Sequence, residues 1–336
     1  MNPVVTWIQA AGGWAPWLFV GLFLAASILM IWRLEALNAR GLEGTVLGTL
    51  VMPYCSGIGN LIFAFVLGSK GGSGAEVLTN CLVNNVTNLT LLIGLPAIIW
   101  GMNGRSARRP KASKKQIQKQ TQENRLNRLS MLLTLAAVLF FTGVTWGLSR
   151  DGRVDFGDGL VLTLLFLFWQ CFHVFDVLKN NARKNETFGW KLPFDLALLA
   201  VGAYGVYVST DWLVAWISKI HTGFVSAQNL GWLSGWLMVV PNGLLAFYYA
   251  RKGNPEVVYT SQVGDGHICI PLCIGIFALY RPIDTPRFFE TGLFILLAVA
   301  ALHFAILAIF GRLPRVIGCL LTASYLVFLY TGLVKP

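Results

Sequence analysis

Charged side chains are scarce in this chain: they make up 12% of its 336 residues, whereas apolar residues make up 55%. A soluble globular domain ordinarily carries about 25% charged residues. Apolar runs close to the roughly 20 residues that a helix needs to cross a bilayer recur along the whole sequence. The composition therefore excludes a soluble globular protein and predicts an all-α integral membrane protein.

Cysteine is present but follows no pattern. The six cysteines lie inside apolar stretches, and their spacings match neither a disulfide framework nor a zinc site. They are interpreted as free, buried thiols, at Cys55, Cys81, Cys171, Cys269, Cys273 and Cys319.

Catalytic motifs are missing as well. The sequence has no phosphate-binding loop, no HExxH pair, no nucleophile elbow and no dinucleotide fingerprint. It therefore predicts neither an enzyme nor a resident cofactor. The N-terminus lacks the basic region and cleavage site of a signal peptide, so the first apolar run is expected to be a membrane span.

Ten transmembrane helices are predicted from the apolar runs. Their expected positions are 15–34, 45–69, 76–102, 129–149, 157–179, 192–216, 224–250, 256–280, 287–311 and 314–334.

Much of the net charge of +11 lies between these spans. The segment 103–128 is the most basic, and positively charged loops remain in the cytoplasm. With an even number of spans, both termini are then expected on the extracytoplasmic side. The basic segment can also contact anionic membrane lipid, but no aromatic residues interleave it, so nucleic acid is not a predicted partner.

An internal repeat links the two halves of the sequence. A shift of 182 residues aligns 60–71 with 242–253, and a shift of 181 residues aligns 84–95 with 265–276. The matched hairpins are five spans apart, and an odd displacement turns the second copy upside down in the membrane. The sequence thus predicts two inverted-topology five-helix repeats, the architecture of many secondary transporters.

The predicted halves are residues 1–186 and 187–336, with the repeats at 41–95 and 231–276. Pro53, together with Gly57 and Gly59, precedes Asn60, and Pro241 precedes Asn242. These residues are expected to break spans two and seven near the bilayer midplane, where freed carbonyl groups can face a ligand.

Polar residues concentrate in both repeats. Asn84 and Asn88 are four residues apart and share a helical face, and the repeat places Asp265 opposite Asn84. A single buried Asn often only stabilises the packing of two helices through a hydrogen bond. A symmetric set of such residues favours a binding site. The predicted cation ligands are Asp265, Asn60, Asn242, Asn84, Asn88 and Ser56.

These segments resemble the alpha-repeats of the calcium/cation antiporter superfamily, which includes the sodium/calcium exchangers. GLEGTVLG (41–48) leads at family spacing to SGIGN (56–60), and NCLVNNVTNLTLLIGL (80–95) resembles the second half of the repeat. Residues 241–276 align with the second copy without a gap. The resemblance implies ten spans and cation antiport by alternating access.

The sequence departs from the family pattern at its chemical centre. The glutamate that follows proline in each repeat is replaced by Asn60 and Asn242, and the last coordinating Asn or Asp of the second repeat is replaced by Cys269. One carboxylate, Asp265, stands at a neighbouring position. Calcium takes 6–8 oxygen ligands and binds more tightly as their charge increases, so tight calcium binding is not expected here.

The resulting hypothesis is a secondary-active cation antiporter whose substrate is sodium, potassium, a proton or, weakly, calcium. Two alternatives remain open. The chain can be a binding or structural membrane protein that kept an exchanger scaffold without transport. If Asp265 pairs with His267 or a lysine, the site would be neutral and would suit a non-cationic solute.

Overall fold

A computed structural model describes residues 3–39, 46–102, 114–181 and 191–334. Its first half is helical apart from a short strand. The elements are α1 (Pro3–Gln9), the 3₁₀ turn η1 (Gly12–Trp14), α2 (Ala15–Ala39), α3 (Val46–Ser69), α4 (Gly74–Leu89), α5 (Leu91–Ile99), α6 (Lys114–Leu148), β1 (Arg153–Val154) and α7 (Phe156–Asn181).

The second half follows the same plan. Its elements are α8 (Lys191–Ile217), the 3₁₀ turn η2 (Ala227–Asn229), α9 (Leu230–Lys252), α10 (Pro255–Gly264), α11 (Gly266–Ile268), the π-helical turn η3 (Cys269–Cys273), α12 (Ile274–Tyr280), β2 (Ile283–Asp284), α13 (Phe289–Phe310), α14 (Arg315–Leu329) and the π-helical turn η4 (Tyr330–Val334). β1 and β2 pair antiparallel and join the two halves at one end of the molecule.

The described residues contain nine helical segments that are long and apolar enough to cross a membrane, and the shorter apolar segment Gly57–Ser69 of α3. Nine of the predicted spans match membrane-length segments, and the predicted span 45–69 matches α3, of which only Gly57–Ser69 forms an apolar segment in the described residues. The all-α membrane fold is therefore confirmed.

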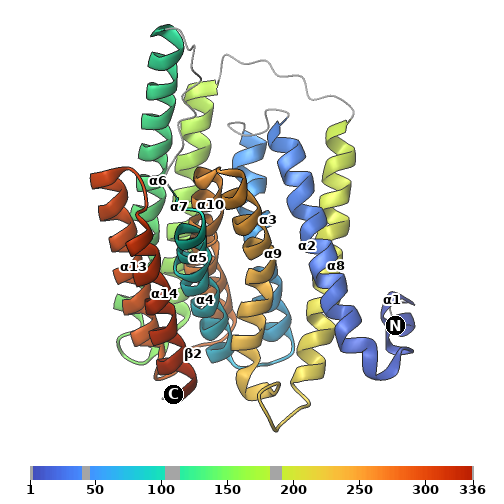
Figure 1. Ribbon diagram of the computed structural model, residues 1–336. Coiled ribbons are helices and arrows are strands. Elements are labelled where there is room, and N and C mark those ends of the chain that lie inside the picture. The colour runs from blue at the N-terminus through green and yellow to red at the C-terminus, as the bar shows by residue number, and fades with distance from the viewer. Residues whose placement is uncertain (1–2, 40–45, 103–113, 182–190, 335–336) are drawn as a thin grey trace.

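The long helix α6 corrects the prediction of a basic loop at 103–128. Residues 103–113 lie outside the described residues, but helix begins at Lys114 and runs without interruption to Leu148. Lysine, arginine and glutamine are strong helix formers, so a basic segment can continue the helix of the following span. Figure 1 shows this end of α6 standing above the other helices.

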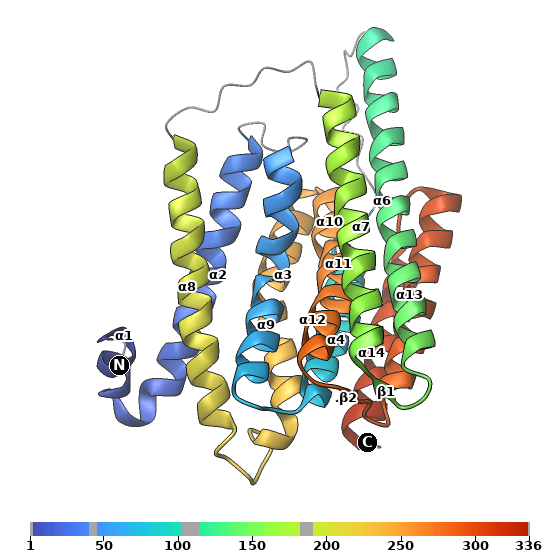
Figure 2. The same cartoon turned by 180° about the vertical axis from the view of Figure 1, so that it is seen from behind.

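Figures 1 and 2 show three groups of helices. α2 and α8 stand together at one flank, and α6, α7, α13 and α14 stand at the other. Between them lie α3, α9 and the interrupted spans α4–α5 and α10–α12. The N- and C-terminal ends lie at the same end of the bundle, opposite the start of α6.

The predicted breaks in spans two and seven are wrong. α3 is one continuous helix, and α9 continues through Pro241. The glycines of α3 serve close packing instead: a Cβ on Gly57 would lie 2.6 Å from Cγ2 of Ile268, and one on Gly59 would lie 2.6 Å from Sδ of Met238. Membrane helices tolerate Pro and Gly because neighbouring groups accommodate the altered backbone.

The interruptions occur in spans three and eight. Span three changes from α4 to α5 at Thr90, and span eight changes from α10 to α11 at Asp265. His303 of α13 supports the first interruption, since its Nε2 donates to the Leu89 carbonyl oxygen at 2.8 Å. Its Nδ1 then accepts from the Tyr259 hydroxyl at 2.9 Å. A helix end at membrane depth is thereby satisfied by another span.

Two glycine contacts repeat the same packing in both halves. A Cβ on Gly94 of α5 would lie 2.9 Å from the carbonyl oxygen of Gly318 on α14. Its repeat partner, Gly275 of α12, meets Gly159 of α7, whose carbonyl oxygen would lie 3.0 Å from the added Cβ. Small residues at such crossings let membrane helices approach backbone to backbone.

Replacing Gly94 with Val is expected to destabilise the protein by about 1–3 kcal/mol, because the added atoms overlap the backbone of α14. Thermal unfolding of the purified protein in detergent measures this effect. Gly143→Val in α6 is the matched control, since a Cβ at Gly143 meets nothing within 4 Å. Equal unfolding midpoints for the two variants would contradict the expected overlap at Gly94.

Candidate functional site

Asp265 lies at the junction of α10 and α11 and is completely buried. Its Oδ2 accepts hydrogen bonds from Nδ2 of Asn88, at 3.1 Å, and from Nδ2 of Asn242. Asn88 comes from α4 in the first repeat, and Asn242 comes from α9 in the second. The carboxylate therefore joins three spans from both halves of the molecule.

Asn84 completes this arrangement. Its Oδ1 accepts from Nδ2 of Asn88 at 3.0 Å, one helical turn away on α4. Asp265, Asn84, Asn88 and Asn242, here called the polar cluster, are all buried, and the first three are 0% exposed. Four of the six predicted ligands thus meet in one place.

Several buried amide groups, some of them in the polar cluster, have unused hydrogen-bonding capacity. Within the described part of the chain, Oδ1 of Asn88, Oδ1 of Asn60 and Oε1 of Gln262 are buried and accept no hydrogen bond. Gln262 adjoins the cluster, because its Nε2 donates to the Asn242 carbonyl oxygen at 3.3 Å. Unpaired buried oxygens are costly, and a cation is one ligand that would satisfy them.

The other predicted ligands have different outcomes. Asn60 is buried on α3 at 2% exposure. The side chain of Ser56 lies outside the described residues. The sequence prediction left open a pair between Asp265 and His267. The Nε2 of that histidine instead lies 3.0 Å from the Thr134 carbonyl oxygen, and its ring packs against Phe141 and Trp169.

Two polar residues of α4 were missed by the sequence prediction. Glu76 accepts a hydrogen bond from the backbone N–H of Gly231 at the start of α9, and Asn80 donates to the Ser234 hydroxyl at 3.0 Å. Both continue the four-residue spacing of Asn84 and Asn88 toward the start of α4. This periodicity is visible in the sequence and would have identified them as one polar stripe facing α9.

The interpretation of the cysteines is partly wrong. Five of the six are described, and all five are free thiols. Cys81, Cys269 and Cys273 are buried, but Cys171 and Cys319 are exposed on the outer surface of the bundle. An apolar sequence does not distinguish the interior of a membrane protein from its lipid-facing surface, because both are apolar.

The described residues contain no group of three or more His, Cys, Asp or Glu side chains arranged to hold a metal ion. A cavity of about 350 Å³ lies apart from the polar cluster, between α2, α8 and α9. Trp17, Leu213 and Met238 are among its mainly apolar lining residues. The ligating capacity of the polar cluster therefore rests on one carboxylate and several amides.

In the described residues, nine membrane-length helical segments and the shorter apolar segment of α3 surround a buried acid where the two repeats meet, an architecture typical of secondary membrane transporters. Within that class, the chain belongs to the sodium/calcium exchanger protein family, whose profile matches residues 14–175 and 194–334. This is a family of cation antiporters and not of enzymes. The chain is accordingly a multi-pass integral membrane protein, and the resemblance seen in the sequence is confirmed.

Solved structures of the sodium-calcium exchanger NCX_Mj share this fold. One, soaked with 2.5 mM Na⁺ and 10 mM Sr²⁺, has a TM-score of 0.63 and 17% identity, covering 95% of this chain and 96% of that chain. Another, soaked with 2.5 mM Na⁺ and 0.1 mM Ca²⁺, has a TM-score of 0.63 and 16% identity, covering 99% of both chains. No curated protein matches the sequence. At this level of identity, the structural likeness establishes the fold alone.

Proposed function

We propose that this protein exchanges cations across a membrane by alternating access and that Asp265 is the charged ligand of the transported ion. One observation carries the proposal: a buried carboxylate accepts hydrogen bonds from amides of both repeats. Relative movement of the two halves would change the distances between the Asp265 carboxylate and these amides. Transport folds place their substrate sites at such repeat interfaces.

The donor set of the polar cluster suits a monovalent cation. Asp265 supplies one negative charge, and Asn88 and Gln262 supply amide oxygens that accept no bond from the described residues. A divalent ion would keep about one uncompensated charge in a medium of low dielectric constant, which penalises it strongly. Sodium, potassium or a proton is therefore the proposed substrate, and calcium would bind weakly.

The polar cluster is closed in this structure. Asp265, Asn84 and Asn88 have no exposed surface, so an ion reaches them only if the surrounding helices separate. Alternating access provides this opening on one side at a time. The hydrogen bonds made by Glu76 and Ser234 connect α4 to α9. These bonds would have to break if the two helices separate.

The test combines binding and flux. Thermal unfolding of the purified protein is measured across a panel of sodium, potassium, calcium and pH, since a ligand that binds only the folded state raises the midpoint. Sodium or potassium is expected to raise the midpoint and to drive flux in proteoliposomes, with calcium effective only at much higher concentration. A folded protein that shows no midpoint shift and no flux with any ion would instead be a non-transporting membrane protein.

A further inference from the structure

His303 lies on α13, outside the polar cluster, and its side chain is completely buried. The imidazole ring makes two hydrogen bonds: Nε2 donates to the carbonyl oxygen of Leu89 at 2.8 Å, and Nδ1 accepts from the hydroxyl group of Tyr259 at 2.9 Å. A neutral imidazole has one donor and one acceptor, so both nitrogen atoms are satisfied. One ring therefore connects α4 of the first half to α10 of the second half.

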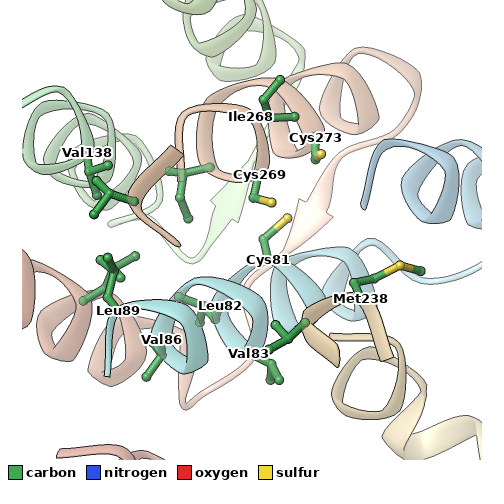
Figure 3. Packing of buried hydrophobic residues seen from close by; sticks show 14 of the residues in the cluster. Cys81, Leu82, Val83, Val86, Leu89, Val138, Met238, Ile268, Cys269 and Cys273 are labelled. Atoms are coloured by element: carbon green, nitrogen blue, oxygen red, sulfur yellow. The ribbon is translucent and has the colours of Figure 1, made fainter. Parts of the chain in front are cut away.

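The first of these bonds ends next to a member of the polar cluster. Leu89 is the last residue of α4 and directly follows Asn88. Nδ2 of Asn88 donates to Oδ2 of Asp265 at 3.1 Å and to Oδ1 of Asn84 at 3.0 Å. Figure 3 shows Leu89 at the end of α4, among buried apolar side chains. Because a hydrogen bond is strengthened in such surroundings, the bond to His303 holds this end of α4, and with it Asn88, in place.

The second bond acts on the span that carries the carboxylate. Tyr259 stands on α10, which ends at the residue before Asp265. The rings of Tyr259 and His303 also meet edge to face, with centroids 5.4 Å apart. Gln262, on the same helix, donates to the Asn242 carbonyl oxygen at 3.3 Å. Contacts on α10 therefore reach both Asp265 and Asn242, and His303 holds this helix against α4.

The interruption in span eight is bonded to the opposite half in a similar way. Nε2 of His267, on α11, lies 3.0 Å from the carbonyl oxygen of Thr134 on α6. A carbonyl oxygen only accepts, so the histidine donates. Buried polar groups are commonly hydrogen-bonded for stability alone. The two bonds of His303 differ from that ordinary case, because they join the two interrupted spans that supply Asn88 and Asp265.

We propose that His303 is a positioning residue for cation binding, which sets the separation of Asn88 from Asp265 by holding α4 and α10 to one rigid ring. This inference rests on the proposed function and adds to it a residue that does not touch the ion. Hydrogen-bonding partners that orient the ligands of an ion commonly change its affinity by about 10–100-fold. Loss of the ring is therefore expected to act on cation affinity.

The test measures cation affinity in variants of the full-length protein. Sodium and potassium are titrated separately, with the unfolding midpoint and the KM of flux in proteoliposomes as readouts. His303→Met removes both hydrogen bonds and is expected to weaken cation binding by about 10-fold or more, with a smaller change in the maximal flux. His303→Gln retains a donor for the Leu89 carbonyl and should restore most of the affinity. Tyr259→Phe should weaken binding alone but add little to His303→Met, because both act through the same ring.

Gly292→Val is the matched control for stability. Gly292 also lies on α13, and a Cβ there would lie 2.8 Å from Cδ1 of Leu82 on α4. This variant disturbs the same pair of helices but keeps both bonds of His303, so it should lower the midpoint without ion and leave cation affinity unchanged. The inference is overturned if Gly292→Val weakens cation binding as much as His303→Met does. Should His303→Met fail to fold, unchanged affinity in Tyr259→Phe overturns it equally.

Titration of the natural sequence separates this inference from the proposed function. Stabilisation and flux that respond to sodium or potassium, and that are the same in the His303 and Tyr259 variants, would refute the positioning role and leave the antiporter proposal standing. If neither ion stabilises the natural protein or crosses proteoliposomes, both proposals fail. Cation binding that is weakened by His303→Met and restored by His303→Gln would support both.

Discussion

Asp265→Asn is expected to abolish cation-driven flux while leaving the fold intact. Asn keeps the size of the side chain and an oxygen that can still accept hydrogen bonds from Asn88 and Asn242. It removes the negative charge that opposes a bound cation. Losing one partner of a buried charge pair costs about 3–5 kcal/mol, so cation affinity should fall by roughly 10² to 10³ or more.

The measurement is ion flux in proteoliposomes together with the ion-dependent shift of the unfolding midpoint. Asp284→Asn is the matched control, because Asp284 lies exposed on β2 and the same chemical change there removes a charge far from the polar cluster. Unchanged flux in the Asp265 variant would remove this residue from the transport mechanism. A lowered midpoint without any ion would show a structural role as well.

Asn242→Glu combined with Asn60→Glu is expected to raise the affinity of the site for calcium. The amide of Asn242 already contacts Asp265, so a carboxylate there would stand beside an existing one. Calcium affinity rises with the number of charged oxygen ligands, and two added carboxylates should raise it by about 100-fold or more. Without calcium the like charges repel one another, so the unliganded variant should melt at a lower temperature.

Calcium-dependent stabilisation and calcium flux are the readouts, with Asn254→Glu at an exposed turn before α10 as the control. Asn242→Glu alone should account for most of the gain, because the structure joins Asn242 directly to Asp265. A double variant that folds but binds calcium no better than the natural sequence would contradict the assignment of Asn242 and Asn60 as ligands.

Much of the fold was accessible from the sequence. Apolar length alone located the ten spans, because crossing a bilayer imposes a minimum helix length regardless of neighbours. The repeat register also paired Gly94 with Gly275, and both residues make the same kind of backbone contact in the two halves. The polar cluster was predicted from two features of the sequence. Four-residue spacing placed Asn84 and Asn88 on one helical face, and the repeat register placed Asp265 at the position equivalent to Asn84.

The errors share one physical cause. Pro53 and Pro241 were expected to break helices, yet α3 and α9 continue, because the consequence of a proline depends on groups that other helices supply. Gly57 and Gly59 were expected to help break span two, whereas the structure shows that they leave room for Ile268 and Met238. Burial of Cys171 and Cys319 was likewise inferred from hydropathy, which does not tell lipid from protein interior.

The sequence by itself determined that this chain crosses a membrane about ten times, that its halves repeat in inverted order, and that it belongs with cation exchangers. These are consequences of local hydropathy, spacing and repeat register. Only the tertiary structure decided that Asp265 joins amides from both halves and that α3 and α9 continue past their prolines. Those contacts depend on how helices distant in sequence are rotated and shifted against each other, and no single segment encodes that relation.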